Sequence, residues 1–439
     1  MGRSGQSTMN DIIVIAGKLS FLRTIRAPIT VGGIVGNASQ TNIVNSSFQG
    51  SIGQTTTITP VATIGGLIGS YSGTGNYFVN NCTVWANIEF SNANIFGDEN
   101  RIGGVIGYSS ASGSIMTNTF FEEGNITITS SNIVHAGGFC GVINAYEINN
   151  CGVLGGTLNI DTSNSVITAG GFSSSFGGNL SNCFSKMNII TKDAPGANIG
   201  GLLGSLNGAS STVDNCYATG FVDSTVINNT TSFDNLCIGG LIGYINANAG
   251  SISNCYALGN VFADKKGTQA SQTLMVGGLV GEIFRGDINN CFSTGQVKAQ
   301  TETGAAYAGG LVGYWYSGYA GDITNCAVSG AAVIANGGTK AAGRISGYPA
   351  DTTPIGNGNR AAQSMLTYEG TYGQTLFTSS TPIGLGNHQQ RQGQAYGDNE
   401  FLNKSFWTGT GSLGFDPVIW SFNKVGSEGF PRLKNLDGQ

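Results

Sequence analysis

A short glycine motif recurs along the central part of the chain and limits what the chain can fold into. The motif is Gly-Gly-apolar-apolar-Gly, and copies begin at Gly32, Gly65, Gly103, Gly137, Gly170, Gly200, Gly239, Gly277 and Gly309. The copy at Gly170 is degraded to GGFSS, and a last relic, AGRISG, spans Ala342–Gly347. The second glycines of successive units lie 30 to 39 residues apart. Such spacing is typical of stacked repeat proteins, in which each unit buries its apolar face against its neighbours.

A second landmark in each unit is an asparagine that follows the second glycine by 11 to 15 residues. Seven of these nine asparagines precede a cysteine, in the pairs Asn81-Cys82, Asn150-Cys151, Asn182-Cys183, Asn215-Cys216, Asn254-Cys255, Asn290-Cys291 and Asn325-Cys326. Asn45 and Asn118 precede Ser46 and Thr119 instead. The residues from Cys82 onward alternate between apolar and polar, which is the period of a strand, and the cysteine belongs to the apolar row. Before the asparagine the apolar parity is reversed, so we expect a corner there, because asparagine tolerates left-handed backbone.

Each unit therefore reads as one coil of short strands joined by turns, and helix signals are poor throughout. Coils stacked about 4.8 Å apart make a parallel β-solenoid. Parallel crossovers are nearly always right-handed. The sequence thus predicts an all-β fold, a right-handed parallel β-helix of about ten coils with terminal caps. We expect an N-terminal cap or extension over residues 1–30, the solenoid over 31–348 and a C-terminal capping segment over 349–439.

The composition argues against several classes of function. Charged residues make up 10 % of the 439 residues and the net charge is −5, so no basic face for nucleic acid is expected. No run approaches the length of a membrane-spanning helix. The N-terminal stretch lacks the features of a secretory signal, so either the chain is intracellular or a signal was removed from it.

The quoted motifs resemble the GLUG-motif repeat family. Residues Gly239 to Val261, GGLIGYINANAGSISNCYALGNV, are close to an ideal unit, and the ending with GFPRL at 429–433 is also similar to this family's C-terminal close. The resemblance implies a β-helical scaffold with an adhesive role, of a kind found mostly in bacterial surface and secreted proteins. It implies no catalytic residues.

The cysteines and asparagines are expected to be structural. We predict a ladder of buried free thiols and a ladder of stacked corner amides, formed by the seven Asn-Cys pairs. Disulfides between neighbouring coils and a metal site remain open as alternatives. A zinc site is not favoured, because no CxxC pair exists and the only histidines are His135 and His388. No cofactor is expected.

Aromatic residues occupy one outward position in four consecutive units, at Phe184, Tyr217, Tyr256 and Phe292. They are candidates for an exposed stripe that stacks on sugars, or for an ordinary outer aromatic stack. Enzymatic β-helices need clustered carboxylates or bases. Here the only adjacent acidic pairs are Asp98-Glu99 and Glu122-Glu123, and we interpret both as solvated loops.

The sequence thus favours a non-enzymatic structural or adhesive scaffold, of the cell-surface or secreted adhesin type. Its partner would be a protein or glycan ligand on another surface, or neighbouring copies in an assembly, with no nucleic acid and no membrane span. An extracellular or cell-surface location is expected, with a cytoplasmic one as the alternative. Two other functions stay open: a structural subunit of a larger intracellular or filamentous complex, and a polysaccharide-active β-helix enzyme.

Overall fold

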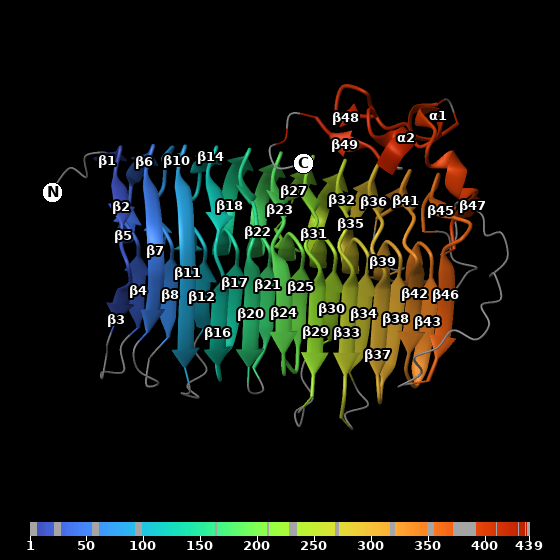
Figure 1. Ribbon diagram of the computed structural model, residues 1–439, viewed down its shortest axis with the longest axis horizontal. Helices are drawn as coiled ribbons and strands as arrows, with labels where there is room; N and C mark the ends of the chain where they lie inside the picture. Colours follow the sequence, from blue (N-terminus) through green and yellow to red (C-terminus); the bar gives the residue numbers. More distant parts are fainter. Residues whose placement is uncertain are drawn as a thin grey trace.

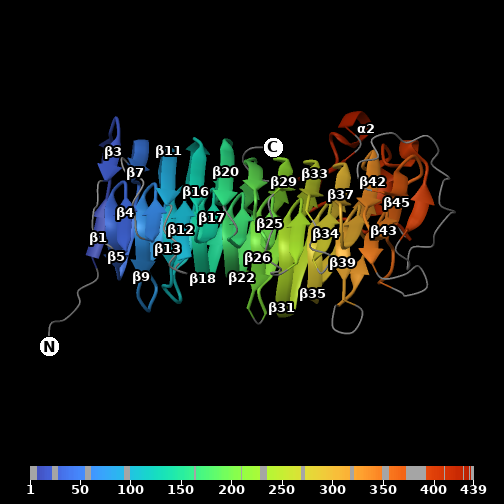
Figure 2. The ribbon, with the colours of Figure 1, turned by 90° about the horizontal axis from the view of Figure 1, so that it is seen from below.

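The chain winds into a rod of stacked parallel strands, which Figures 1 and 2 show from two sides. The computed structural model describes residues 7–21, 28–54, 61–92, 99–162, 165–208, 210–227, 235–267, 272–316, 321–348, 355–371, 392–409, 411–428, 430–434 and 436. Every strand pairing along the rod is parallel, and short antiparallel pairing joins only β48 (Trp420–Ser421) and β49 (Arg432–Leu433) among the described residues. The predicted all-β parallel β-solenoid is confirmed, and its right-handed sense stays a prediction.

Each coil contributes to three walls of the rod. The first wall, here called the GG sheet, has ten strands that each end at the first glycine of a repeat. They are β4 (Ile29–Gly32), β8 (Ala62–Gly65), β12 (Glu99–Gly103), β17 (Ile133–Gly137), β21 (Ile167–Gly170), β25 (Ala197–Gly200), β30 (Leu236–Gly239), β34 (Thr273–Gly277), β38 (Ala305–Gly309) and β43 (Thr339–Gly343).

The second wall, the Asn sheet, leads from the glycine turn to the asparagine corner and has 16 strands. They are β1 (Ser7–Asn10), β5 (Val35–Ser39), β6 (Thr41–Val44), β9 (Ile68–Ser72), β10 (Phe78–Asn80), β13 (Ile106–Ser109), β14 (Ile115–Thr117), β18 (Cys140–Asn149), β22 (Ser173–Ser181), β26 (Leu203–Asn207), β27 (Thr212–Asp214), β31 (Ile242–Ser253), β35 (Val280–Asn289), β39 (Val312–Trp315), β40 (Ile323–Thr324) and β44 (Ser346–Tyr348).

The third wall, the Cys sheet, starts after the asparagine corner. It consists of two ladders of paired strands, and the long strands β7 and β11 take part in both ladders. Its strands are β2 (Ile13–Ile15), β3 (Leu19–Phe21), β7 (Ser47–Gln54), β11 (Thr83–Asn92), β15 (Phe120–Glu123), β16 (Ile126–Ser130), β19 (Gly152–Val153), β20 (Thr157–Thr162), β23 (Phe184–Ser185), β24 (Asn188–Lys192), β28 (Tyr217–Ala218), β29 (Val222–Val226), β32 (Tyr256–Ala257), β33 (Val261–Lys265), β36 (Phe292–Ser293), β37 (Val297–Thr301), β41 (Ala327–Val328), β42 (Ala332–Asn336), β45 (Arg360–Ala362), β46 (Leu366–Gly370) and β47 (Gln394–Tyr396).

The glycine pairs are required by close approach of neighbouring coils. A Cβ on Gly66 would collide with the backbone oxygen of Gly104 in the next coil, and Gly66 donates its own N–H to that oxygen at 3.0 Å. In the last repeat the strand register pairs Gly309 with Gly343, so Arg344 stands where the second glycine is expected. In the relic AGRISG, Gly343 is therefore the first glycine of the pair and not, as the spacing of the repeats suggested, the second.

The asparagine corners are present in every repeat where the parity change predicts them. All nine asparagines have φ between 48° and 53°, the left-handed region that asparagine adopts more readily than most residues. After the corner the alternation holds, since Val84, Ala86 and Ile88 of β11 are buried while Trp85 and Asn87 are exposed. The inward rows of the three walls form one continuous apolar core.

The stack extends past both predicted boundaries of the solenoid. β1, β2 and β3 pair with β6 and β7, so residues 7–21 form a further, partial coil rather than a separate cap. At the other end β45 and β46 continue the Cys sheet beyond residue 348. Gln392 then closes the core end by hydrogen bonding the buried Arg344, whose Nε donates to the Gln392 carbonyl at 3.0 Å.

The last segment turns back along the side of the rod instead of only closing its end. It holds η1 (Asp398–Glu400), α1 (Lys404–Thr408), β48, α2 (Val425–Glu428) and β49. Figure 1 shows it above the Cys sheet, over β32, β36 and β41. We call the described part of residues 398–436 the C-terminal cover.

Candidate functional site

The aromatic stripe predicted to face a ligand is stacked but not exposed. Phe184, Tyr217, Tyr256 and Phe292 pair in register from coil to coil, with ring centroids 5.1, 5.0 and 4.9 Å apart and nearly parallel planes. Their exposed fractions are 0 to 1 %. The prediction that these four rings face a ligand is therefore wrong, and the interpretation as an outer aromatic stack describes them.

The C-terminal cover explains the burial of the second half of the stripe. The Trp420 ring lies 6.1 Å from Tyr256 and 5.8 Å from Phe292, and the Phe430 ring stacks on Phe292 at 5.6 Å. The guanidinium of Arg432 lies over the Tyr256 ring at 5.7 Å. Large outward rings stacked in a row would leave a broad apolar surface, and the cover removes that surface from water.

The corner asparagines form a ladder of amides with two kinds of partner. Asn81 donates to the Oδ1 of Asn45 at 2.8 Å, and Asn150 donates to that of Asn118 at 2.7 Å. In other coils the acceptor is the residue that precedes the corner asparagine of the coil before. Asn182 donates to Asn149 Oδ1, and Asn254 donates to Asp214 Oδ1. Six of the nine corner asparagines, namely Asn45, Asn81, Asn118, Asn150, Asn182 and Asn254, tie their coil in this way to the one before it.

All nine cysteines are buried, and none of them forms a disulfide. All seven corner thiols donate to the carbonyl two residues earlier within 3.5 Å, for example Cys291 to Asn289. Burial raises the pKa of Cys82 to about 11, and it raises the pKa of Cys140 well above the ordinary thiol value. Burial keeps the corner thiols away from solvent, which favours a structural role for this ladder.

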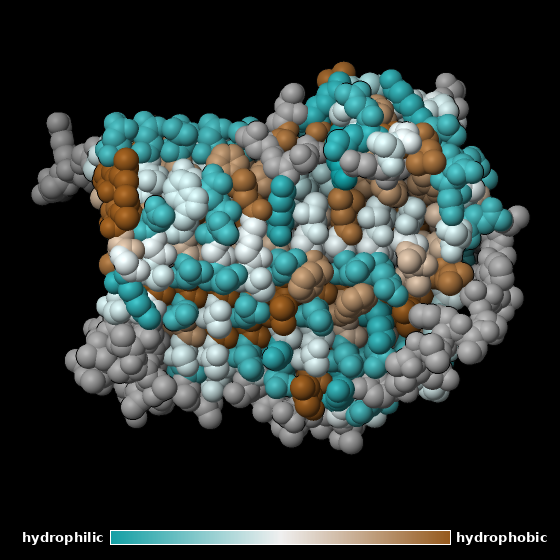
Figure 3. Space-filling view, in the orientation of Figure 1, coloured by the Kyte–Doolittle hydropathy of each residue, from teal (hydrophilic) through white to brown (hydrophobic). Residues whose placement is uncertain are grey.

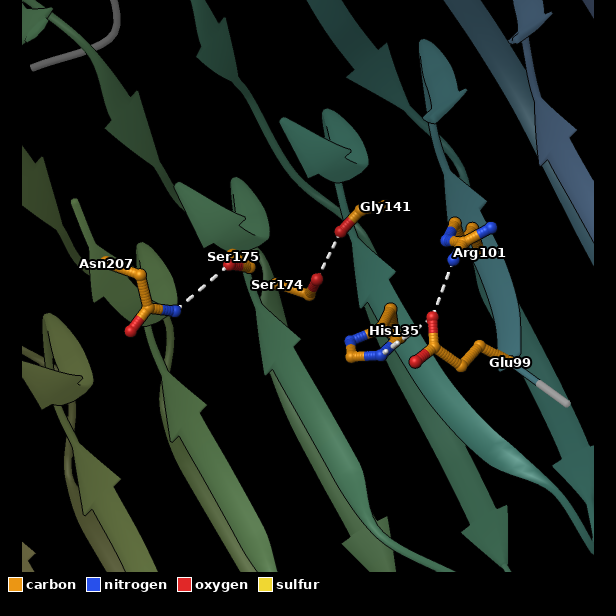
Figure 4. Close-up of polar contacts among 7 residues, drawn as sticks. All are labelled: Glu99, Arg101, His135, Gly141, Ser174, Ser175 and Asn207. Atoms are coloured by element: carbon orange, nitrogen blue, oxygen red, sulfur yellow. Dashed lines mark hydrogen bonds and ion pairs between the residues drawn. The ribbon is translucent and has the colours of Figure 1, made fainter. Parts of the chain in front are cut away.

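The acidic pairs of the sequence lie in strands and not in solvated loops. Glu99 opens β12, and Glu122 and Glu123 end β15; Asp98 lies outside the described residues. Glu99 Oε2 lies 2.6 Å from Arg101 and 3.8 Å from His135 Nε2, so the three side chains link two coils on the GG sheet (Figure 4). Burial lowers the pKa of His135, which disfavours the imidazolium.

This polar group does not assemble a hydrolytic site. Ser174, which replaces the third glycine of the degraded repeat, is fully buried and donates to the carbonyl of Gly141 (Figure 4). A serine held in this way serves the backbone rather than a substrate. Among the described residues, no group of three His, Cys, Asp or Glu side chains is placed to hold a metal ion.

An exposed aromatic cluster lies elsewhere, at the junction of the GG and Asn sheets in the C-terminal coils. This tyrosine cluster consists of Tyr307, Tyr314, Tyr316, Tyr348 and Phe284. The rings of Tyr314 and Tyr348 stack at 4.5 Å, and Tyr307 meets both at 5.3 and 5.4 Å. Tyr316 is 40 % exposed and the other four are half-buried.

Charged and polar groups border the tyrosine cluster. Glu282 accepts a hydrogen bond from the Cys237 thiol at 3.1 Å, and burial raises the pKa of the Glu282 carboxyl. The guanidinium of Arg285 lies 5.5 Å from the Phe284 ring. Burial, with smaller contributions from neighbouring tyrosines and Glu282, raises the pKa of Tyr314 to about 12, so its hydroxyl stays protonated at neutral pH.

The repeat contained a signal for this cluster. The residue after the third glycine of each unit occupies one row on the Asn sheet, which runs Asn37, Ser70, Tyr108, Val142, Ser175, Ser205, Tyr244, Glu282, Tyr314 and Tyr348. Tyrosine gathers at the C-terminal end of that row. Aligning the units on their third glycine would have found Tyr314 and Tyr348.

Comparison with known proteins identifies the repeats. The family model described as "The GLUG motif" matches residues 234–261 and 273–298, which span two coils. Stacked coils carrying this motif define a GLUG-type β-solenoid. The chain carries GLUG repeats over these residues, and the resemblance drawn from its sequence is confirmed there.

A solved structure from Bacteroides ovatus labelled "putative immunoglobulin A1 protease" is also similar in outline. It aligns with 17 % identity and a TM-score of 0.38, covering 82 % of this chain and 86 % of the other. A search of curated proteins found no match. No helix in the described part of the chain is both long and apolar enough to span a membrane.

Proposed function

We propose that the protein is a non-enzymatic adhesive scaffold whose tyrosine cluster docks a protein partner at the cell surface or outside the cell. The observation that carries the proposal is a packed cluster of five aromatic rings on a rod of parallel strands, with Tyr316 exposed and the other four half-buried. Tyrosine is enriched at protein interfaces, because it supplies a large apolar area together with a hydroxyl.

The geometry of the cluster favours a protein over a saccharide. Tyr314 and Tyr348 stack on each other, so part of their ring faces is already occupied. Their edges and hydroxyls, with Glu282 beside Tyr314 and Arg285 over the Phe284 ring, suit side chains and backbone groups of a polypeptide. The parallel strands give the cluster a fixed base, which lowers the entropy lost on binding.

The test compares binding to arrays of extracellular proteins and of glycans. We expect the wild-type chain to bind at least one protein, and the double variant Tyr314→Ala/Tyr348→Ala to bind it at least about ten-fold more weakly, as loss of interface hot spots predicts. Tyr108→Ala, in the same row on a distant coil, is the control and should bind normally. Unchanged binding by the double variant, or binding to glycans through the same tyrosines, would refute the assignment of a protein partner. If the protein fractionates with the cytoplasm and binds nothing on either array, the adhesive function is contradicted.

A second candidate function is assembly with other copies of the chain. Ile13 and Ile15 on the first, partial coil are 71 % and 76 % exposed, which is unusual for isoleucine on a sheet. Sedimentation over a range of concentrations would detect such assembly. If Ile13→Ser/Ile15→Ser leaves an observed oligomer intact, these residues do not form its interface. An assay on acidic polysaccharides with calcium addresses the enzymatic alternative.

A further inference from the structure

We propose that a groove on the Cys sheet of the N-terminal coils binds an uncharged saccharide, with Trp85 as its stacking surface. The groove has a volume of about 530 Å³ and lies on a different wall from the tyrosine cluster. Its ligand class also differs, so the inference goes beyond the proposed function.

The groove exists because the Cys sheet carries stacked glycines at this level. Gly124 and Gly156 form part of its lining and have φ of 146° and 102°. A Cβ on Gly124 would collide with the carbonyl oxygen of Ala86, and one on Gly156 with that of Gly124. At Gly124, in the break between β15 and β16, and at Gly156 the wall therefore carries no side chain and is hollowed.

Trp85 stands at this hollow without a structural reason to do so. It is 40 % exposed on β11, whose other exposed residues are the polar Asn87 and Glu89. Its partners in the register of the neighbouring coils are Gln49 and Glu123, both polar. A large indole among polar groups beside a concave glycine floor is the arrangement expected of a binding site rather than of a core.

Fixed amides surround the indole and supply hydrogen bonds for hydroxyl groups. The Oδ1 of Asn87 accepts the backbone N–H of Asn125 at 2.9 Å, and the Oδ1 of Asn125 accepts that of Thr157 at 3.0 Å. These bonds hold each amide in one orientation, with its Nδ2 donors on the opposite side. Gln49 and Glu123 add an amide and a carboxylate to the lining.

The charge of the lining selects against acidic sugars. Among the described residues that line the groove, Glu123 alone is ionisable, and it would repel a uronate or a sulfated sugar. The volume lies in the range of small-ligand sites, which suits a short oligosaccharide. Figure 3 shows that this side of the N-terminal coils is open, whereas the C-terminal segment stands over the C-terminal coils.

Tryptophan fluorescence offers a direct test, because Trp85 is exposed while Trp315, Trp407 and Trp420 are buried. A panel of neutral and uronate-containing oligosaccharides is titrated into the full chain, and emission and its quenching by acrylamide are followed. We expect at least one neutral oligosaccharide to protect the exposed indole from quenching and no uronate to do so. If no neutral oligosaccharide protects it, the proposal is wrong.

Variants then separate the groove from other surfaces, with titration calorimetry as the readout. Trp85→Ala should weaken saccharide binding at least ten-fold, Trp85→Phe should retain part of it, and Glu123→Gln should relax the exclusion of uronates. Phe78→Ala is the matched control, since Phe78 is also 40 % exposed but lies on the Asn sheet. Wild-type affinity in a folded Trp85→Ala variant would overturn the proposal. Saccharide binding should survive Tyr314→Ala/Tyr348→Ala, so failure here and failure of the tyrosine cluster are distinguishable.

Discussion

The corner at Asn290-Cys291 allows a direct comparison of the two residues that define the repeat. Substituting Asn290→Leu puts a branched side chain on a left-handed backbone with φ of 52°. Substituting Cys291→Ser exchanges a buried thiol for a hydroxyl in the same place. We expect the first change to destabilise the solenoid clearly and the second to be mild.

The magnitudes follow from the geometry of this corner. A non-glycine residue in the left-handed region costs roughly 1–2 kcal/mol, and asparagine already carries part of that cost, so Asn290→Leu should lose at most about 1–2 kcal/mol. Cys291 donates to the Asn289 carbonyl at 3.1 Å. Ser46 and Thr119 make the same bond in their own coils, at 2.7 and 2.9 Å, so a serine hydroxyl finds its acceptor and Cys291→Ser should cost less than about 1 kcal/mol.

The assay is urea unfolding of both variants, with Asn290→Gly as the control for strain. Glycine restores left-handed freedom, so Asn290→Gly should be less destabilising than Asn290→Leu by a measurable margin. Because repeat arrays can unfold in parts, the midpoints should be followed by both circular dichroism and fluorescence. Equal tolerance of Asn290→Leu and Cys291→Ser would refute the reasoning, since left-handed backbone would then not be what the repeat needs from asparagine.

Three further outcomes are expected. Trp420→Ala should detach the C-terminal cover at a cost of about 3–5 kcal/mol and expose the stripe at Tyr256, which binding of a hydrophobic dye would detect; unchanged dye binding would contradict the cover. Burial lowers the pKa of His135, so this residue contributes stability above its ordinary pKa of about 6.5, and that stability is lost as the pH falls through the lower pKa of the folded state. The melting temperature of His135→Thr should therefore depend less on pH in that acidic range than that of the wild type. Threonine is chosen because Thr168 occupies the paired position in the next coil. The absorbance titrations of the wild type and of Tyr314→Phe should differ by one phenol that ionises near pH 12. If that phenol ionises near pH 10 instead, Tyr314 is not buried as described.

The features that could be predicted from the sequence are those set within one repeat. The strand alternation after Cys82 and the parity change at Asn81 depend on neighbouring residues, and both appear in the structure. The glycine pairs likewise report a contact that every coil makes with the next. Repetition helped, because the same local signal occurs nine times.

The features that could not be predicted depend on contacts between distant parts of the chain. The rings of Tyr256 and Phe292 point away from the core, as alternation requires, yet their burial depends on Trp420 and Phe430, more than 100 residues further on. Period and parity give the direction of a side chain and not what later covers it. The tyrosine cluster was missed for a related reason, since its members come from three different repeats.

The position of the C-terminal cover also bears on the meaning of Trp85. The outward row of the Cys sheet that carries the stripe reads Ser47, Thr83, Phe120 and Gly152 before it reaches Phe184. It becomes continuously aromatic only from Phe184 on, and the cover packs on the part of the row at Tyr256 and Phe292. The fold thus covers outward rings where they stack. Trp85 lies two residues after Thr83 of this row, beside glycines that leave a hollow. Phe221, on the same wall, is also 40 % exposed, so exposure alone does not single out Trp85. The hollow and the fixed amides beside the indole do, and that is why the groove at Trp85, rather than the covered stripe, is where saccharide recognition should be sought.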